Sequence, residues 1–350
     1  MEITEKRNIT SINEAELTAW LINNKEAAFR CKQIFEWLWK KNISSFDDMK
    51  NISGVLQEKL KKDFYFHPVT IAEAHISKDG SRKYVFELFD GLRVEGVLIT
   101  SENRNTACIS SQVGCPLACA FCATGIAGFA RNLTYDEIYR QVLNINEQSD
   151  KLNNKNLSNI VLMGMGEPLL NYENVLHAIN LITTDKGLSM SPQRIMLSTV
   201  GIVDKIRLLA DKKPRFNLAL SLHAATDEKR IKIIPSAKHN SISQLIEALK
   251  YYNITTGQRI HIEYAMFDNF NDTNEDAKNL LIFCKNFPVK INLIPYNSTT
   301  NTNYKSSSAD KIKKFANILI EKNLVVTIRE SRGADINAAC GQLANKPKYN

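Results

Sequence analysis

Short apolar runs alternate with longer amphipathic segments from about residue 105 onward, and this alternation constrains the fold more than any other feature. The apolar runs predict strands at 107–110, 159–163, 194–197, 216–222, 260–266, 290–294 and 324–328. Amphipathic helices are predicted at 135–146, 174–184, 243–252, 274–286 and 311–321. Repeated strand-helix units indicate an α/β protein with a parallel sheet. Six to seven units fall short of the eight of a complete barrel, so we expect a partial (βα)6 barrel of the TIM type.

The chain ahead of this alternation has two parts with different patterns. Residues 1–65 show a helical spacing of apolar residues and predict a small N-terminal helical domain. Residues 66–101 carry two alternating runs separated by Asp90 and Gly91, a pair typical of hairpin turns, and predict a β-hairpin extension. Residues 102–350 then form the main domain.

One carboxylate of the predicted hairpin is a candidate catalytic group. Glu95 shares a strand face with Val97 and Ile99, so its side chain can point inward among apolar neighbours, where a carboxylate can act as a general base. The same pattern fits a surface glutamate on an edge strand. The sequence leaves both interpretations open.

Composition narrows the class of protein. Of the 350 residues, 45 are Lys or Arg and 37 are Asp or Glu, and the net charge of +8 favours a polyanionic partner such as nucleic acid. Solvated lysines and core tryptophans are the plainer interpretation of the basic, Trp-containing segment 30–41. No window resembles a membrane span or a signal peptide, and seven cysteines, an odd number, do not form a secreted disulfide pattern. We therefore expect a cytoplasmic protein with no membrane partner.

Three of the seven cysteines lie close together: Cys115, Cys119 and Cys122, in C-x3-C-x2-C spacing. Zinc sites usually need four protein ligands, and no second C-x-x-C follows. Three thiolates suit a 4Fe-4S cluster that leaves one iron open to a substrate or cofactor. A zinc site completed by a distant residue and three unrelated buried cysteines remain as alternatives. With Phe121 before the third cysteine, the run resembles the signature of the radical S-adenosylmethionine (SAM) superfamily, whose open iron binds SAM.

Small and polar residues follow several of the predicted strands. In βα folds the catalytic groups gather at the carboxyl ends of the strands, so these residues are expected at one rim. They are Gly164, Gly166 and Glu167 in G-M-G-E-P-L, then Ser198, the run Ser221, Leu222 and His223, and Asn297. Singly, each fits a tight turn, a solvated carboxylate or a structural histidine. Together they predict a ligand pocket.

Two further cysteines fall near the same rim. Cys108 lies at the end of the first predicted strand, and Cys340 lies in the C-terminal stretch R-E-S-R-G-A-D-I-N-A-A-C-G-Q-L. Cys340 alone would most simply be a small buried residue. Together the two offer a second set of thiols beside the pocket, and their pairing is a hypothesis.

The whole chain resembles the RlmN group of radical SAM RNA methyltransferases, which make C2-methyladenosine. The resemblance rests on S-S-Q-V-G-C-P-L-A-C-A-F-C-A-T-G, G-M-G-E-P-L-L-N, L-S-T-V-G, L-A-L-S-L-H-A, L-I-P-Y-N and G-A-D-I-N-A-A-C-G-Q-L. It implies that 102–350 is a radical SAM catalytic domain and that 1–65 is an RNA-binding accessory domain. It implies a cluster held by Cys115, Cys119 and Cys122, and SAM bound by Gly166, Glu167, Ser198, Ser221, Leu222, His223 and Asn297. Glu95 matches the family's general base, although Gly96 follows it where many members have Ala.

The resemblance also implies a reaction that uses two SAM molecules per turnover. One SAM methylates the thiolate of Cys340, and a second is cleaved reductively at the single 4Fe-4S cluster. The resulting 5′-deoxyadenosyl radical takes hydrogen from that methyl group, and the carbon radical adds to adenine to give a covalent protein-RNA adduct. Proton loss to Glu95 and attack by Cys108 release the product and leave a disulfide between Cys108 and Cys340.

The partners that the resemblance implies are an adenosine of 23S rRNA, the adenosine beside the anticodon of some tRNAs, and an external electron donor such as flavodoxin. We expect a monomer. Two other functions stay open. A Cfr-like enzyme would use the same residues to methylate carbon 8 of adenine, and a noncatalytic iron-sulfur RNA-binding protein would need neither Cys340 nor the residues at the SAM rim.

Overall fold

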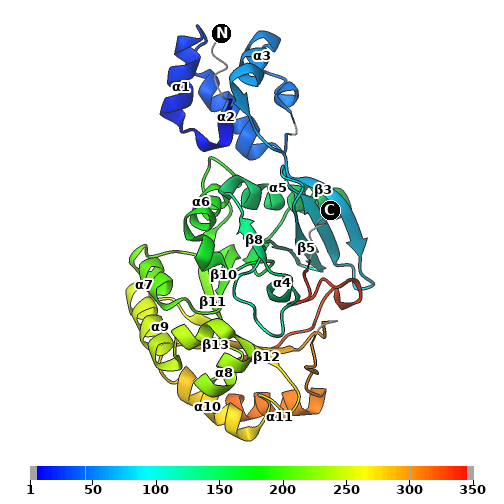
Figure 1. Cartoon of the computed structure of the whole chain (residues 1–350), viewed down its shortest axis with the longest axis vertical. Helices are drawn as coiled ribbons and strands as arrows, with labels where there is room; N and C mark the ends of the chain where they lie inside the picture. Colours follow the sequence, from blue (N-terminus) through cyan, green and yellow to red (C-terminus); the bar gives the residue numbers. More distant parts are fainter. Residues whose placement is uncertain (1–5, 44, 300–301, 345–350) are drawn as a thin grey trace.

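The computed structural model describes residues 6–43, 45–299 and 302–344. Helices α1, α2 and α3 form a lobe at one end of the described chain, and a larger body built around one sheet forms the rest (Figure 1). No helix in the described part of the chain has the length and apolar character needed to cross a membrane.

The main sheet has ten strands in the order β14-β13-β12-β11-β10-β9-β6-β5-β4-β3. The seven strands from β14 to β6 are parallel to their neighbours, and β5, β4 and β3 continue the sheet with antiparallel pairing. The parallel strands are β6 (Arg104–Cys108), β9 (Asn159–Leu162), β10 (Ile195–Thr199), β11 (Asn217–Ser221), β12 (Ile260–Met266), β13 (Val289–Pro295) and β14 (Val325–Ile328). The antiparallel strands are β3 (Thr70–Ile76), β4 (Arg82–Glu87) and β5 (Arg93–Ser101).

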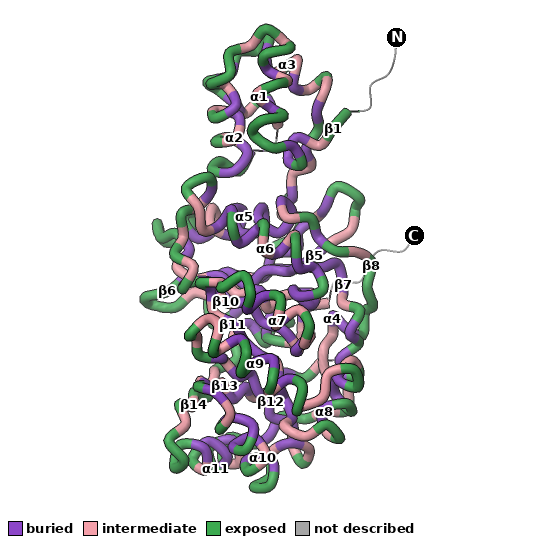
Figure 2. Tube along the Cα trace, turned by 90° about the vertical axis from the view of Figure 1, so that its left-hand side faces the viewer, coloured by how far each residue is buried: buried purple, intermediate pink, exposed green. Residues whose placement is uncertain are grey.

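A helix follows each of the first six parallel strands. The helices are α5 (Tyr135–Asn153), α6 (Tyr172–Thr183), α7 (Val203–Asp211), α8 (Asp227–Ile233) with α9 (Ile242–Thr256), α10 (Asn274–Cys284) and α11 (Ala309–Ile320). The sheet ends at β14 on one side and β3 on the other, so the expected partial (βα)6 barrel is confirmed. Buried residues run through the strands and along α5 (Figure 2).

Several predicted boundaries shift for local reasons. Strand β6 starts at Arg104 and pairs with β5, so it begins earlier than the predicted 107–110. Helix α5 continues past the predicted end at residue 146, and it ends where Asn154 adopts a left-handed conformation with φ of 51°. Strand β3 was not predicted because most of its side chains are exposed and give no apolar alternation. The turn at Gly91 has φ of 76°, as a hairpin of this kind requires.

The N-terminal lobe contains α1 (Glu14–Asn23), α2 (Arg30–Lys40) and α3 (Gly54–Asp63). Hydrogen bonds join the lobe to α5: the Tyr139 hydroxyl donates to the carbonyl of Trp39, and the Thr10 hydroxyl donates to Asp136 over 3.1 Å. One continuous hydrophobic core includes residues of both the lobe and the sheet. A deletion of the lobe would therefore expose core residues of α5.

Candidate active site

A cavity of about 230 Å³ lies at the carboxyl ends of the parallel strands. The predicted site residues that line it are Cys108, Cys115, Cys119, Cys122, Gly166, Glu167, Ser198, Ser221, His223, Asn297 and Cys340. Glu95 and Leu222 are not among its lining residues. Strand ends that are far apart in the sequence therefore meet at one rim, as expected for a βα fold.

Residues 115–122, which we call the cluster loop, connect β7 (Gln112–Gly114) to the short helix α4 (Ala123–Ile126). Backbone hydrogen bonds hold the loop at Cys115, which donates to Gly128 over 2.8 Å, and at Ala120, which donates to Ile233 over 2.9 Å. The Phe121 ring lies edge-on to His223, with 5.0 Å between centroids. The cluster loop is thus fixed against the walls of the cavity.

The thiols of the cluster loop influence one another. Burial, with Cys122 and Glu167 nearby, raises the pKa of Cys115 to about 12. Burial and the two neighbouring thiols raise the pKa of Cys119. A cationic centre bound among these thiols would favour their thiolate forms.

The donor set fits an iron-sulfur cluster. Within the described ranges, no group of three or more His, Cys, Asp or Glu side chains could hold a single metal ion. A cluster makes a different demand, because each cysteine binds a different iron atom. Three cysteines on one short loop, lining one cavity, meet that demand.

Glu167 fixes the turn that follows β9. Its carboxylate accepts hydrogen bonds from the backbone N–H groups of Leu169 (3.1 Å) and Val200 (2.9 Å), and burial raises its pKa. The carbonyl of Val200 accepts from the buried Arg230 guanidinium, which also donates to Leu222 over 3.3 Å. These contacts tie together the ends of β9, β10 and β11 at the cavity.

The glycines of this turn allow close approach of two chain segments. A Cβ atom at Gly164 would lie 2.6 Å from the carbonyl oxygen of Ile109, and one at Gly166 would lie 2.6 Å from the Cβ of Gln112. Gly166 also has φ of +102°, which side chains disfavour. The structure therefore explains these glycines by close packing against the chain that follows β6.

His223 is held as a neutral ring. Its Nδ1 accepts the backbone N–H of Ala265 over 2.9 Å, so the hydrogen of the neutral imidazole is on Nε2. Burial, with Arg230 nearby, lowers the pKa of His223 to about 3. At neutral pH this residue can therefore donate a hydrogen bond to a ligand without carrying a positive charge.

Ser198 and Ser221 lie side by side, with 3.1 Å between their hydroxyl oxygens. Leu222 is fully buried, and its backbone N–H donates to the carbonyl of Glu263 over 3.0 Å. The Leu222 side chain is thus part of the core. Any contact of this residue with a ligand would come from its backbone.

Cys108 and Cys340 are both free thiols that line the cavity. Burial, with Cys340 nearby, raises the pKa of Cys108 to about 12. The Cys340 side chain is exposed by its surface area, yet the protein atoms around the cavity partly desolvate the thiol and raise its pKa, whereas Arg329 opposes that rise. The two thiols lie near enough to influence each other, as the hypothesis of a thiol pair requires.

Sequence reasoning missed four charged residues of the cavity: Glu263, Arg329, Glu330 and Arg332. Glu263 on β12 accepts from Asn292 over 2.7 Å and pairs with Arg329 over 3.5 Å. Arg329 follows β14, where the sequence shows only a short apolar run before a charged tail. Arg329 directly follows a predicted strand and could have been found from that place, whereas Glu263 lies inside β12, where its signal was a carboxylate within a mostly apolar run.

Residues 333–344, which we call the Cys340 segment, contribute part of the lining of the cavity and contact the cluster loop region. The carbonyl of Gly341 accepts from Ala123 over 2.8 Å, next to Cys122. The carbonyl of Cys340 itself accepts from the Asn297 side chain over 3.5 Å. These contacts place the Cys340 segment beside the predicted cluster ligands.

Glu95 is buried, with 4% of its surface exposed, so the interpretation as a surface glutamate is wrong. Strand β5 runs antiparallel to β6, with Val97 opposite Cys108, so the start of β5 lies at the same rim. One Glu95 oxygen pairs with Lys83 over 3.2 Å, and the other accepts the backbone N–H of Ala344 over 3.1 Å. The carboxylate lies beneath the end of the Cys340 segment.

Comparison with known proteins gives two family matches. Residues 7–65 match the model described as the ribosomal RNA large subunit methyltransferase N-terminal domain. Residues 109–281 match the radical SAM superfamily. The first match coincides with the helical lobe, and the second contains the cluster loop and most of the cavity.

Full-length relatives are also similar. A protein of Cytophaga hutchinsonii named "Probable dual-specificity RNA methyltransferase RlmN" is 48% identical over 98% of this chain and 94% of its own length. A protein of the same name from Clostridium perfringens is 44% identical over 96% of both chains. The crystal structure of a radical SAM methyltransferase from Sphaerobacter thermophilus superposes with a TM-score of 0.91 at 35% identity, covering 96% of this chain and 99% of the other.

Proposed function

The chain belongs to the RlmN family of radical SAM methyltransferases, and from that premise we propose that it methylates carbon 2 of adenosine in two RNA substrates. These are one adenosine of 23S rRNA and the adenosine beside the anticodon of some tRNAs. The name of the relatives, dual-specificity RNA methyltransferase, supports two RNA classes. The match of 7–65 to a ribosomal RNA methyltransferase domain supports the first of them.

SAM and an iron-sulfur cluster are the cofactors that the radical SAM family implies. The finer proposal is one 4Fe-4S cluster held by Cys115, Cys119 and Cys122, with two SAM molecules used per turnover. SAM would lie against Gly166, Glu167, Ser198, Ser221, Leu222, His223 and Asn297. Bound there, the cofactors would supply the methyl group, the one-electron chemistry that removes hydrogen from it, and an acceptor for the electron that the adduct loses.

Cys340 is the proposed methyl carrier, and Cys108 is the proposed second thiol. The support is their shared cavity, together with free thiols at both positions. Attack of the Cys108 thiolate on the Cys340 sulfur forms an S–S bond and breaks the bond between that sulfur and the methylene carbon. The electron pair of the broken bond stays on the carbon, which takes up a proton and becomes the methyl group. The two cysteines end the turnover as a disulfide that must be reduced.

Glu95 is the proposed acceptor of the proton that carbon 2 loses. Its support is a buried carboxylate at the rim, beside the strand that carries Cys108. Two donors hold the carboxylate, so it enters the reaction with a fixed orientation. Glu95 does not line the cavity, so the adenine of the RNA would have to pass the Cys340 segment to contact the carboxylate.

The helical lobe offers a surface for RNA. A hollow on it is lined by Glu36, Trp37, Lys41, Lys50 and Asn51. Trp37 keeps part of its ring exposed, whereas Trp39 is buried against Tyr139. Neither Lys41 nor Lys50 has an ion-pair partner within the described ranges. An exposed ring beside free ammonium groups suits an unpaired base and its phosphates.

The remaining proposals follow from the same premise. Residues 1–65 act as an RNA-binding accessory domain, 66–101 as the hairpin extension and 102–350 as the catalytic domain. The protein acts as a monomer in the cytoplasm, where its RNA substrates are, and takes electrons from an external donor such as flavodoxin.

The observation that carries this function is the gathering of the three-cysteine loop, Cys108 and Cys340 around one cavity. The test is mass spectrometry of nucleosides from 23S rRNA and tRNA of a strain that lacks the gene. We expect 2-methyladenosine to disappear and to return with the wild-type gene. Loss of 8-methyladenosine in its place would identify the Cfr-like activity, and unchanged RNA would identify a noncatalytic protein.

A further inference from the structure

We propose that Lys83 is a positioning residue. Its ammonium group fixes the orientation of the Glu95 carboxylate relative to the Cys340 segment. The proposal rests on the proposed function, because it takes Glu95 as the proton acceptor and Cys340 as the methyl carrier. Lys83 touches neither cofactor nor substrate in this account. It acts through Glu95.

Lys83 is a buried lysine with two partners. Only 8% of its surface is exposed. Its Nζ pairs with Oε1 of Glu95 over 3.2 Å and donates to the carbonyl of Asn337 over 3.4 Å. On the β4 and β5 ladder Lys83 lies opposite Val97 and Val85 lies opposite Glu95, so the ammonium and the carboxylate are diagonal neighbours on one face.

The two partners of Lys83 connect it to both flanks of Cys340. Asn337 precedes Cys340 by three residues, and its carbonyl is bound by Lys83. Ala344 follows Cys340 by four residues, and its backbone N–H donates to Oε2 of Glu95 over 3.1 Å. The ion pair of Lys83 and Glu95 therefore holds the Cys340 segment at both ends, and the segment in turn orients the carboxylate.

Other contacts hold the same segment without Lys83. In the turn between β3 and β4, Asp79 accepts the backbone N–H of Gly333 over 2.8 Å, and the backbone N–H of Lys78 donates to Asp335 over 3.1 Å. Farther along, Gln342 donates to the carbonyl of Ser298 over 3.0 Å. Loss of the Lys83 ammonium should therefore leave Cys340 near its place, but it removes one of the two donors that orient Glu95.

The chemistry explains why a cation is needed at position 83. A buried carboxylate without a charged partner is costly, and it can turn or take up a proton to lower that cost. Either response removes the base that must accept the proton from carbon 2, while the electron pair of that C–H bond stays on the ring. Formation of the adduct needs no base, so replacement of Lys83 should slow only the steps that follow adduct formation.

The test compares Lys83→Met, Lys83→Arg and Glu95→Gln in the full-length, cluster-loaded protein. Intact mass reports methylation of Cys340, and denaturing electrophoresis with and without nuclease reports the covalent RNA adduct. Lys83→Met should methylate Cys340 within about twofold of wild type and resolve the adduct at least about tenfold more slowly, so the adduct accumulates as it does in Glu95→Gln. Lys83→Arg keeps the charge and should recover most of the rate. The double variant that combines Lys83→Met with Glu95→Gln should resolve the adduct no more slowly than Glu95→Gln alone, because both changes remove the same function.

Lys78→Met is the matched control. It removes an equal charge from the same hairpin, but its side chain is exposed, so it should behave as wild type. Iron content and the unfolding midpoint of Lys83→Met show whether the variant is folded. Resolution at the wild-type rate in Lys83→Met, with the adduct trapped in Glu95→Gln, overturns the role of Lys83 and leaves the proposed function intact. No trapped adduct in Glu95→Gln overturns the role of Glu95, and the role of Lys83 with it.

Discussion

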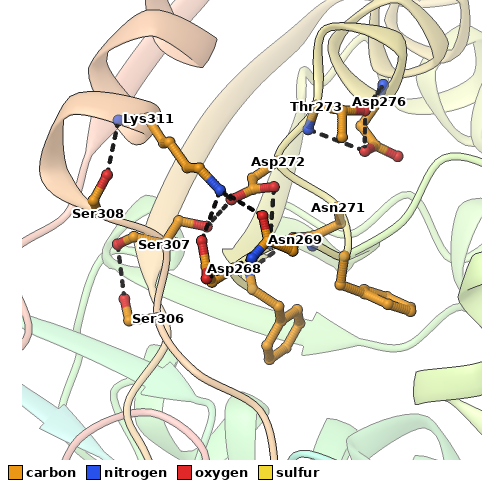
Figure 3. A network of polar contacts seen from close by, with 12 residues as sticks. Asp268, Asn269, Asn271, Asp272, Thr273, Asp276, Ser306, Ser307, Ser308 and Lys311 are labelled. Carbon is orange, nitrogen blue, oxygen red and sulfur yellow. Dashed lines mark hydrogen bonds and ion pairs between the residues drawn. The ribbon is translucent and has the colours of Figure 1, made fainter.

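The side chain of Asn271, labelled in Figure 3, gives the strongest prediction for stability, because this one buried amide holds three backbone groups. Its Oδ1 accepts the backbone N–H of Phe267 over 2.7 Å. Its Nδ2 donates to the carbonyls of His223 over 2.7 Å and Ala265 over 2.6 Å. Asn271→Ala leaves all three groups without this partner.

The structure sets the size of the effect. Each buried group that loses its partner costs about 1–3 kcal/mol, and water that enters the vacated space recovers part of that cost. At the lower limit the three groups destabilise the protein by about 3 kcal/mol. That cost lowers the urea midpoint by roughly 1 M if the slope of the unfolding free energy is near 3 kcal/mol/M. The affinity for SAM should fall as well, because the His223 carbonyl is no longer held.

Asn269→Gly is the matched control in the same loop. Asn269 is exposed and has φ of 57°, which glycine adopts without strain. Its side chain shares Lys311 with Asp268 and Asp272, so the loss of one of three partners should cost less than about 1 kcal/mol. A change below about 1 kcal/mol for Asn271→Ala, measured by urea unfolding, would refute the idea that this amide holds the wall of the cavity.

Three further predictions concern cofactor, charge and RNA. Replacing any cysteine of the cluster loop by Ala should abolish the iron-sulfur absorbance and reductive SAM cleavage; a variant with full iron content would remove that cysteine from the ligand set. The pKa of His223 is about 3 in the folded protein and near 6.5 in the unfolded chain, so the unfolded chain binds a proton first as the pH falls. The free energy of unfolding should therefore decrease by about 2 kcal/mol between pH 7 and pH 5. Urea unfolding of His223→Gln at the two pH values should lack this decrease. Trp37→Ala should weaken RNA binding about tenfold, and Lys41→Glu should weaken it and also reduce the dependence of RNA affinity on salt. Lys250→Glu, on the distant helix α9, should change the RNA affinity little. Equal effects of the two lysine variants would contradict a local RNA surface.

The sequence predicted the strand-helix order because buried parallel strands leave continuous apolar runs. Strand β12, Ile260–Met266, matches its prediction at both ends. Strand β3 could not be found this way, since its exposed side chains leave no periodic signal. The rim residues were found because the carboxyl ends of parallel strands meet at one edge, which is a property of the fold and needs no coordinates.

Contacts between distant segments could not be predicted. The strand pattern of Glu95 fits both a buried and a surface side chain, and only the packing of β5 beside β6 and under the Cys340 segment decides between them. The hydrogen bond from Lys83 to Asn337 joins positions 254 residues apart, which no local pattern encodes. The link between Asn271 and the His223 carbonyl is of the same kind.

The most direct test of the proposed mechanism is peptide mass spectrometry of Cys108→Ala and Cys340→Ala variants after reaction with RNA, SAM and a reductant. Cys108→Ala should form the methylene bridge and fail to resolve it, so a nucleotide should remain attached at Cys340. Cys340→Ala lacks the sulfur that carries the methyl group and should form no adduct. A crosslink at another residue, or equal behaviour of the two variants, would contradict the roles assigned to these thiols.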